Sequence, residues 1–417
     1  MGGVQGTLVV ANMPGALTVV AGLPLVARAV LELRAAGYAA VTVFAGPQAR
    51  RVAALLEPRC PDVAGLGSPD EAAALGWPEL VLVVAGDVLF DPAALAPLLA
   101  AATPGGVHFG QVPGAPGPEV PAAVCPGSAI PRLLAEASRG GGLRVEGLRR
   151  VGGAAAGGVP LTDGLLVPAD RAPARRVLET ALLDHLARRT SAKDSFLAAL
   201  VDRRLSRPLT RLLLGSPVTP SQITVVSIAL GLAGAVGLAT ISYAGRLAGV
   251  GALIASIVLD CVDGELARAR FQQSAAGARL DVLGDYVVHL AAFLGLAIGL
   301  ARQGLPPGGV WAAAGLVAGV GAAMATMHAI FVRPALRGGG DLHWSGEPAG
   351  LPDTPLTAIV EKLASRDYTY LLLVLALLGH LEWFLYAAAV GSWVFVAGVL
   401  GYRGYQRLAL RRPVVSQ

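Results

Sequence analysis

The chain is poor in cysteine and in lysine. Its three cysteines, Cys60, Cys125 and Cys261, are odd in number and lack metal-ligand spacing, so we predict free thiols in a reducing compartment. Lys193 and Lys362 are the only lysines, and arginine therefore supplies most of the positive charge behind the net +5. No basic block is interleaved with aromatic residues, which form only 5% of the chain. We therefore expect no nucleic-acid partner and assign the arginines a membrane-facing role.

Charge is also scarce, at 15% of residues, whereas hydrophobic residues reach 54% and the mean hydropathy is +0.61. These values are high for a soluble protein, and the apolar excess lies in the second half of the 417 residues. The first 20 residues lack the basic, apolar and small-residue regions of a secretory signal, so we expect a cytoplasmic N-terminus. The length favours two or three domains.

The first half has an α/β pattern. Short apolar runs alternate with helical patterns in the order βαβα, which predicts a parallel sheet. The expected strands are residues 7–11, 40–45 and 80–85, and the expected helices are 23–36, 47–56 and 92–102. Two stretches rich in proline and glycine, 104–121 and 152–160, are predicted to be surface loops.

The second half contains six apolar segments of membrane-helix character. They cover residues 223–242, 247–270, 280–300, 310–332, 368–380 and 383–402. Before them, residues 196–213 place leucines on one helical face and Arg203, Arg204, Arg207 and Arg211 largely on the other, which predicts an amphipathic helix on an anionic membrane surface rather than a soluble packing helix. We therefore divide the chain into a soluble domain (1–190), a juxtamembrane helix and linker (191–218) and a six-helix transmembrane domain (219–417).

Basic residues predict the orientation of these segments. One membrane face carries the juxtamembrane arginines and most of the basic residues that follow, whereas the other has only Arg246 and Arg302. By the positive-inside rule, both termini and the acidic segment that begins at Asp260 face the cytoplasm of a multi-pass inner-membrane protein. Asp260 lies thirteen steps after Leu247, which is about 20 Å of helix against roughly 30 Å of hydrocarbon. Its carboxylate is therefore expected within the cytoplasmic leaflet.

Four aspartates and an arginine stand inside this lipid-soluble sequence. Asp260 and Asp263 share one helical face, while Asp281 and Asp285 share a face of the next helix, so the two helices can bring their acids together. Each charge costs at least about 2.5 kcal/mol in a bilayer unless it is paired or bound to a metal. Carboxylate oxygens suit Mg²⁺ or Mn²⁺. The alternative interpretation is an acid-lined ion pathway.

The spacing of the acids resembles a family signature. The pattern D-x2-D-G-x2-A-R-x8-G-x3-D-x3-D is that of the CDP-alcohol phosphotransferases, and this chain has every fixed position. The resemblance implies transfer of a substituted phosphoryl group from a CDP-linked donor, CDP-diacylglycerol or a CDP-polyol, to an alcohol, with release of CMP. It also implies a homodimer formed through the membrane domain. One departure is Ser221, which follows Thr219-Pro220 where the family usually has asparagine.

The resemblance also implies roles for individual residues. Asp260, Asp263 and Asp281 would be metal ligands, and Asp285 would be the general base that also touches a second metal. The nucleotide site would be lined by Gly264, Ala267, Arg268 and Gly277. Arg333 and Arg337 are candidates to hold a phosphate of the acceptor, although positive-inside topology is the favoured explanation for both.

The first half resembles a nucleotidyltransferase domain. Gly22-Leu-Pro-Leu-Val-Ala-Arg28 matches that family's helix start, and Val84-Ala-Gly-Asp87 matches the strand that ends in a metal-binding aspartate. The triphosphate loop is replaced by residues 12–17 and its lysine is absent, so we expect the fold to be kept and the activity lost. Asp87 and Asp163 are then turn aspartates rather than metal ligands.

The two halves together resemble bifunctional enzymes that make CDP-inositol and then join it to inositol phosphate. Because the triphosphate loop is degenerate, we expect only the second type of half-reaction. Two alternatives stay open: a truly bifunctional enzyme, and a non-catalytic membrane protein that senses nucleotide.

The predicted orientation can be tested by thiol labelling in intact cells. A cysteine placed near Arg337 or Arg411 should resist an impermeant thiol reagent, because both positions are predicted to be cytoplasmic. A cysteine near Gln303 should react, with the unaltered chain as the background control. The reverse pattern would contradict the cytoplasmic placement of the acids.

Overall fold

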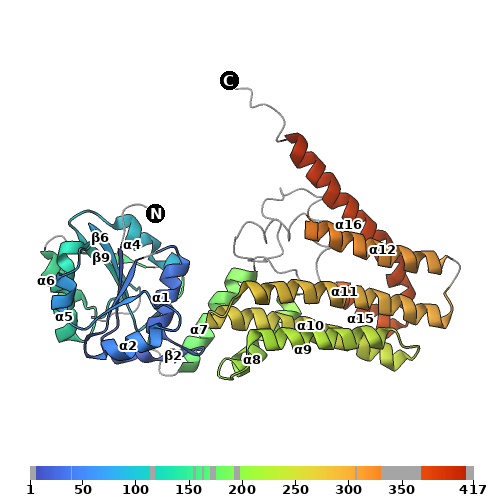
Figure 1. The fold of residues 1–417 in the computed structure, drawn as a ribbon, viewed down its shortest axis with the longest axis horizontal. Helices are drawn as coiled ribbons and strands as arrows, with labels where there is room; N and C mark the ends of the chain where they lie inside the picture. The colour runs from blue at the N-terminus through green and yellow to red at the C-terminus, as the bar shows by residue number, and fades with distance from the viewer. Residues whose placement is uncertain are drawn as a thin grey trace. The chain divides into compact units, whose positions relative to one another are not determined.

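The computed structural model describes residues 6–38, 40–112, 118–153, 156–161, 164–169, 175–191, 198–305, 308–329 and 368–409. The chain forms two compact units, Met1–Ala187 and Arg188–Gln417. The first is an α/β unit and the second is helical (Figure 1). Both predicted fold classes are therefore confirmed.

A seven-stranded sheet forms the centre of the first unit, in the order β10-β8-β9-β6-β1-β4-β5. Strands β1, β4, β5 and β6 pair in parallel, as predicted from the alternating pattern. The buried apolar runs place these strands, because β1 and β6 are buried along their whole length. The strand bounds are β1 Gly6–Val10, β4 Val41–Phe44, β5 Ala64–Leu66, β6 Leu80–Ala85, β8 Val107–Gln111, β9 Ala122–Pro126 and β10 Ala156–Pro160. Short pairs are formed by β2 (Val19–Val20) with β3 (Leu23–Pro24) and by β7 (Val88–Phe90) with β11 (Leu166–Pro168).

Two predictions about this sheet are wrong. The sheet is mixed rather than parallel, because β9 runs antiparallel to both β6 and β8. Strands β8 and β10 also lie inside the stretches predicted to be loops. Gly110 shows the reason: a Cβ there would lie 2.4 Å from Leu161 Cδ1, so this glycine allows close packing within a strand rather than a turn.

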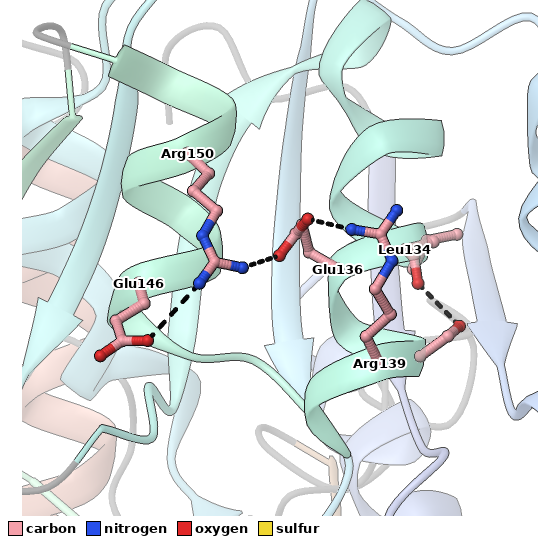
Figure 2. A network of polar contacts seen from close by, with 6 residues as sticks. Leu134, Glu136, Arg139, Glu146 and Arg150 are labelled. Atoms are coloured by element: carbon pink, nitrogen blue, oxygen red, sulfur yellow. Dashed lines mark hydrogen bonds and ion pairs between the residues drawn. The ribbon is translucent and has the colours of Figure 1, made fainter.

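Helices flank the sheet at the bounds α1 Leu25–Ala35, α2 Ala49–Leu56, α3 Pro69–Ala73, α4 Ala96–Ala101, α5 Ile130–Gly140, α6 Val145–Gly152 and α7 Arg175–Ser191. Figure 2 shows the polar network that joins α5 to α6, in which Glu136 accepts from Arg139 at 2.6 Å and from Arg150 at 2.8 Å. Both arginines are mostly exposed, so these ion pairs add little stability. The buried side chains of the sheet and its helices hold the unit together.

The cysteines are free thiols, as predicted. Cys125 lies in β9, where burial raises the pKa of its thiol to about 12. Burial is also the main cause that raises the pKa of the Cys60 thiol. Neither thiol is therefore a reactive thiolate at neutral pH.

All six apolar segments of the second unit contain a helix. Among the described residues, five helices are long and apolar enough to cross a membrane: α9 Pro220–Leu238, α10 Tyr243–Arg270, α11 Ala275–Gln303, α12 Gly309–Met327 and residues Leu381–Gly401 of α16 (Leu381–Ala409). The remaining segment, residues 368–380, contains the shorter apolar helix α15, Tyr368–Leu378, of 11 residues. A tight turn joins α15 to α16, and Gly379 in it has a φ of +76° that favours glycine.

Glycine contacts pack α9 against its two neighbours, with which it runs side by side (Figure 1). A Cβ at Gly249 of α10 would lie 2.7 Å from Gly234 O of α9, and one at Gly295 of α11 would lie 2.2 Å from Ala235 O. The backbones are thus close enough that only glycine fits at these positions, as in other membrane helix pairs.

The juxtamembrane segment forms a short π-helix, Ala198–Asp202, followed by α8, Arg203–Leu213. Leu205, Leu209 and Leu212 are exposed on its outer side, as the predicted apolar face requires. The prediction for Arg203 is wrong, because this arginine is buried together with Ser206 and Thr210. The inner side of the helix therefore carries a stripe of polar side chains.

The end of α10 opposite the acids is fixed by Arg246. Its guanidinium donates to Thr240 O at 2.9 Å, to Gln303 Oε1 at 2.7 Å and to Gly299 O at 2.7 Å. These bonds join the α9–α10 connection to the end of α11 and satisfy a charge that is expensive within a membrane.

The glycine packing predicts that one of two neighbouring substitutions is destabilising and the other is not. Gly249→Val should lower the free energy of unfolding by about 1–3 kcal/mol, the usual cost of overpacking. Gly251→Val is the matched control, because a Cβ at Gly251 meets nothing within 4 Å. Thermal unfolding of the purified variants in detergent measures both. Equal midpoints for the two variants would contradict the proposed role of close backbone packing.

Candidate active site

Helices α10 and α11 bring three of the predicted acids together. Asp260 and Asp263 lie one turn apart on α10, and Asp281 approaches them from α11. One carboxylate oxygen of each residue lies within 4.8 Å of the others. This convergence depends on the short connection between the helices, where α10 ends at Phe271 with a left-handed φ of +52° and Ser274 caps α11 by accepting from Gly277 N at 3.0 Å.

The donor set fits a hard divalent cation. At 4.8 Å, two carboxylate charges repel by roughly 3 kcal/mol with the effective dielectric of a partly exposed site. Among the described residues, Asp281 Oδ1 is buried and has no hydrogen-bond partner. Three close carboxylates, one of which has a buried oxygen without a hydrogen-bond partner, fit the oxygen ligands that Mg²⁺ or Mn²⁺ prefers.

Asp263 is oriented by a neighbouring helix. Thr224 Oγ1 of α9 lies 2.5 Å from Asp263 Oδ2 and donates to it. This bond holds the buried Asp263 carboxylate from the α9 side. Thr224 was not predicted from the sequence; its only sequence signal is its place one turn after the Thr219-Pro220 helix start. The start itself is a capping box between Thr219 and Gln222.

The small residues of the motif leave the α10 backbone accessible. The three atoms nearest to a Cβ built at Gly264 all belong to the Arg268 guanidinium, whose closest nitrogen would be 3.2 Å away. Ala267 is half-buried on the same helix. Ser221 Oγ lies 3.9 Å from the position of a Cβ at Gly277, so this serine stands beside the motif where the family has asparagine.

A pocket opens beside the acids. Asp260, Asp281 and Asp285 line it, and Asp285 lies one turn beyond Asp281 on α11. The pocket also contains polar side chains that sequence reasoning missed. They are Thr224, Ser227, Ser256, His289, Tyr368 and Thr369.

His289 has a defined orientation in this pocket. Its Nδ1 lies 2.7 Å from Asp285 O, one turn earlier on α11, and its ring meets Tyr368 edge to face with centroids 5.7 Å apart. His289 continues the face that carries Asp281 and Asp285 at intervals of four residues, and this spacing is the signal that could have revealed it.

The remaining candidates lie elsewhere in the sequence. Arg333, Arg337 and Asp163 lie outside the described residues. In the first unit, Asp87 is buried, and a Cβ at Gly15 would lie 2.9 Å from Asp87 Cβ. The short helix Pro14–Leu17, at the position of the triphosphate loop, therefore packs directly on this aspartate.

Sequence comparisons identify the family of the chain. The family model for CDP-alcohol phosphatidyltransferase matches residues 217–401. A bifunctional IPC transferase and DIPP synthase of Rubrobacter xylanophilus is 32% identical over 327 residues, which are 69% of this chain and 73% of that protein. This chain belongs to the CDP-alcohol phosphatidyltransferase family. The predicted resemblance is confirmed, and the chain is a multi-pass membrane transferase.

Other relatives of this CDP-alcohol phosphatidyltransferase cover smaller parts or are more distant. A bifunctional IPC transferase and DIPP synthase of Thermococcus kodakarensis is 39% identical over 111 residues, 26% of this chain and 24% of that one. Crystal structures of Mycobacterium tuberculosis phosphatidylinositol phosphate synthase (PgsA1) also match. The form with CDP-DAG bound is 22% identical, with a TM-score of 0.32, over 51% of this chain and 98% of that chain. The complex with manganese and citrate is 23% identical, with a TM-score of 0.32, over 51% and 92%.

Proposed function

We propose that this chain transfers a substituted phosphoryl group from a CDP-linked donor to an alcohol, with release of CMP, at a divalent metal site formed by Asp260, Asp263 and Asp281. The observation that carries this proposal is the convergence of three carboxylate oxygens within 4.8 Å between two membrane helices, beside an open pocket. A bound Mg²⁺ or Mn²⁺ would withdraw charge from the diphosphate of the donor.

The reaction exchanges the phosphoanhydride bond of the donor for a new phosphoester bond. The acceptor oxygen forms a bond to the phosphorus that carries the donor's alcohol, and the bond from that phosphorus to the CMP oxygen breaks. The acceptor hydroxyl loses its proton to Asp285, whose place in the pocket wall next to Asp281 supports this role. The electron pair of the broken bond leaves with CMP.

The nucleotide is assigned to the cytoplasmic half of α10 and the start of α11. Gly264, Ala267 and Gly277 let the donor approach the helix backbones, and Arg268 supplies a planar guanidinium that suits a diphosphate. The Arg268 guanidinium lies beside Gly264 on α10.

The acceptor is assigned to the pocket beyond the acids. Hydroxyl and imidazole groups in its mostly apolar lining offer hydrogen-bond partners to the hydroxyl of the alcohol. Arg333 and Arg337 are proposed to hold a phosphate of such an acceptor. The names of the relatives, bifunctional IPC transferase and DIPP synthase, support a polyol product, and CDP-diacylglycerol is the alternative donor.

The first unit is proposed to keep a nucleotidyltransferase-like fold without cytidylyl transfer. The packing of Pro14–Leu17 on Asp87 supports this, because the space next to the aspartate is filled by the chain itself. A bifunctional enzyme is the second candidate, favoured by a curated relative of that name that matches 69% of the chain. We further propose a homodimer through the membrane helices, with both termini and the acids facing the cytoplasm of an inner membrane.

Product analysis tests the transfer reaction and the first unit together. Purified protein with Mg²⁺, a CDP-polyol or CDP-diacylglycerol and a panel of alcohols should release CMP, and EDTA should stop the release. With CTP and phosphorylated polyols instead, the same protein should release no pyrophosphate. CMP release that persists in EDTA would contradict the metal site, and pyrophosphate release would establish the bifunctional reaction.

The acids should differ in their roles. Asp285→Asn should leave donor binding nearly unchanged but lower turnover by about 10²-fold or more, the usual contribution of a positioned base. Asp260→Asn and Asp263→Asn should weaken both Mg²⁺ and donor binding, because these carboxylates would hold the metal that withdraws charge from the diphosphate. Isothermal titration and CMP-release rates measure these effects. If Asp285→Asn abolished metal binding and Asp260→Asn did not, the roles would have to be exchanged.

A further inference from the structure

The motif helix carries one more buried acid, Glu265. It stands at a variable position of the signature, between Gly264 and Ala267, and is 6% exposed. Two residues correspond to about 200° of helix rotation, so Glu265 points away from the side on which Asp263 faces the acid cluster. Its carboxylate is therefore on the back of the helix that bears Asp260 and Asp263.

Three side chains of α8 donate to this carboxylate. Arg203 Nη1 lies 2.9 Å from Glu265 Oε1, Ser206 Oγ lies 2.9 Å from the same oxygen, and Thr210 Oγ1 lies 2.5 Å from Oε2. The donors follow one another at intervals of three and four residues, so they form a single stripe along α8. All three are buried, which explains why the inner side of the juxtamembrane helix is polar.

We propose that Glu265 is a positioning residue that fixes the rotation of α10 and thereby the placement of the metal-binding oxygens of Asp260 and Asp263. The inference rests on the metal site of the proposed function. Thr224 binds Asp263 on the front of the helix, and α8 binds Glu265 on its back, so the ligand-bearing turn is held from both sides.

Metal binding requires precise ligand positions, and these positions depend on the rotation of α10 about its axis. Side-chain atoms lie about 5–6 Å from a helix axis, so a rotation of about 10° moves a carboxylate oxygen by roughly 1 Å. Metal–ligand distances tolerate changes of about 0.2 Å. A loss of the rear anchor that leaves the helix intact is therefore enough to weaken the metal site.

Arg270 supports the same arrangement at the end of α10. Its guanidinium donates to Val218 O at 2.6 Å, to Ser216 O at 2.8 Å and to Leu214 O at 3.0 Å, and also to Leu213 O. These carbonyls belong to the end of α8 and the loop after it. Tyr370 of α15 donates to Asp202, the residue before α8, and its neighbours Tyr368 and Thr369 line the pocket. Helix α8 and the residue before it are thus bonded to α10 and α15, and both of these helices contribute residues to the pocket wall.

The experiment measures metal binding directly, without the reaction. Mn²⁺ is titrated into the detergent-purified full chain and free Mn²⁺ is followed by electron paramagnetic resonance. Glu265→Gln keeps the shape of the side chain and removes its charge, so the dissociation constant should rise by on the order of 10-fold, as for other residues that orient metal ligands. The number of Mn²⁺ sites per protein should stay unchanged, whereas a purely structural defect would reduce that number at unchanged affinity.

Two arginines of α8 provide a matched pair. Arg203→Met should raise the dissociation constant for Mn²⁺ like Glu265→Gln. Arg204→Met should leave it unchanged, because Arg204 is the exposed neighbour of the buried Arg203. If Glu265→Gln does not give folded protein, Thr210→Val removes a single donor and should raise the constant several-fold.

Two different outcomes overturn two different claims. The positioning role alone is overturned if folded Glu265→Gln binds Mn²⁺ with unchanged affinity. If Glu265→Gln does not fold, unchanged affinity in Thr210→Val has the same meaning. A loss of affinity in Arg204→Met equal to that in Arg203→Met also overturns it. No Mn²⁺ binding by the unaltered chain overturns the metal site of the proposed function and this inference with it.

Discussion

The structure of the second unit depends on one constraint: three carboxylates must lie within 4.8 Å of one another between membrane helices. Such a cluster is stable only when each charge has a compensating partner. Thr224 donates a hydrogen bond to Asp263, and a divalent cation would neutralise part of the charge of the three carboxylates. The same requirement applies to Glu265 and Arg270, which find their partners on α8 and in the loop that follows it.

The glycines of α9, α10 and α11 help to fix the positions of these helices, although they lie at a distance from the acids. Where Gly249 and Gly295 meet the backbone of α9, the helices approach as closely as atoms permit. Contact between backbones leaves little freedom to slide or rotate, since no flexible side chain intervenes. Close glycine packing toward the membrane face opposite the acids and polar contacts near the acids therefore act on the same helices. Together they fix the relative positions of the metal-binding oxygens.

Much of this arrangement could be predicted from the sequence, because it follows from short spacings. Acids three and four residues apart must share a helical face, and six apolar segments must become helices. The role of α8 could not be predicted, because leucine and arginine spacing alone does not distinguish Arg203, which is buried, from Arg204, which is exposed. The antiparallel strand β9 and the strands in glycine-rich stretches were missed for a similar reason. Their placement depends on partners distant in the sequence, and local composition carries no information about those partners.

The stripe of donors on α8 has a consequence for protein engineering. Chimaeric enzymes are often built by joining the soluble part of one protein to the membrane part of another at the linker. In this chain such a junction placed after Thr210 would separate Glu265 from all three of its donors and leave an uncompensated carboxylate in the interior. The juxtamembrane helix and the membrane domain therefore have to come from the same parent protein, and a junction is best placed before Asp202.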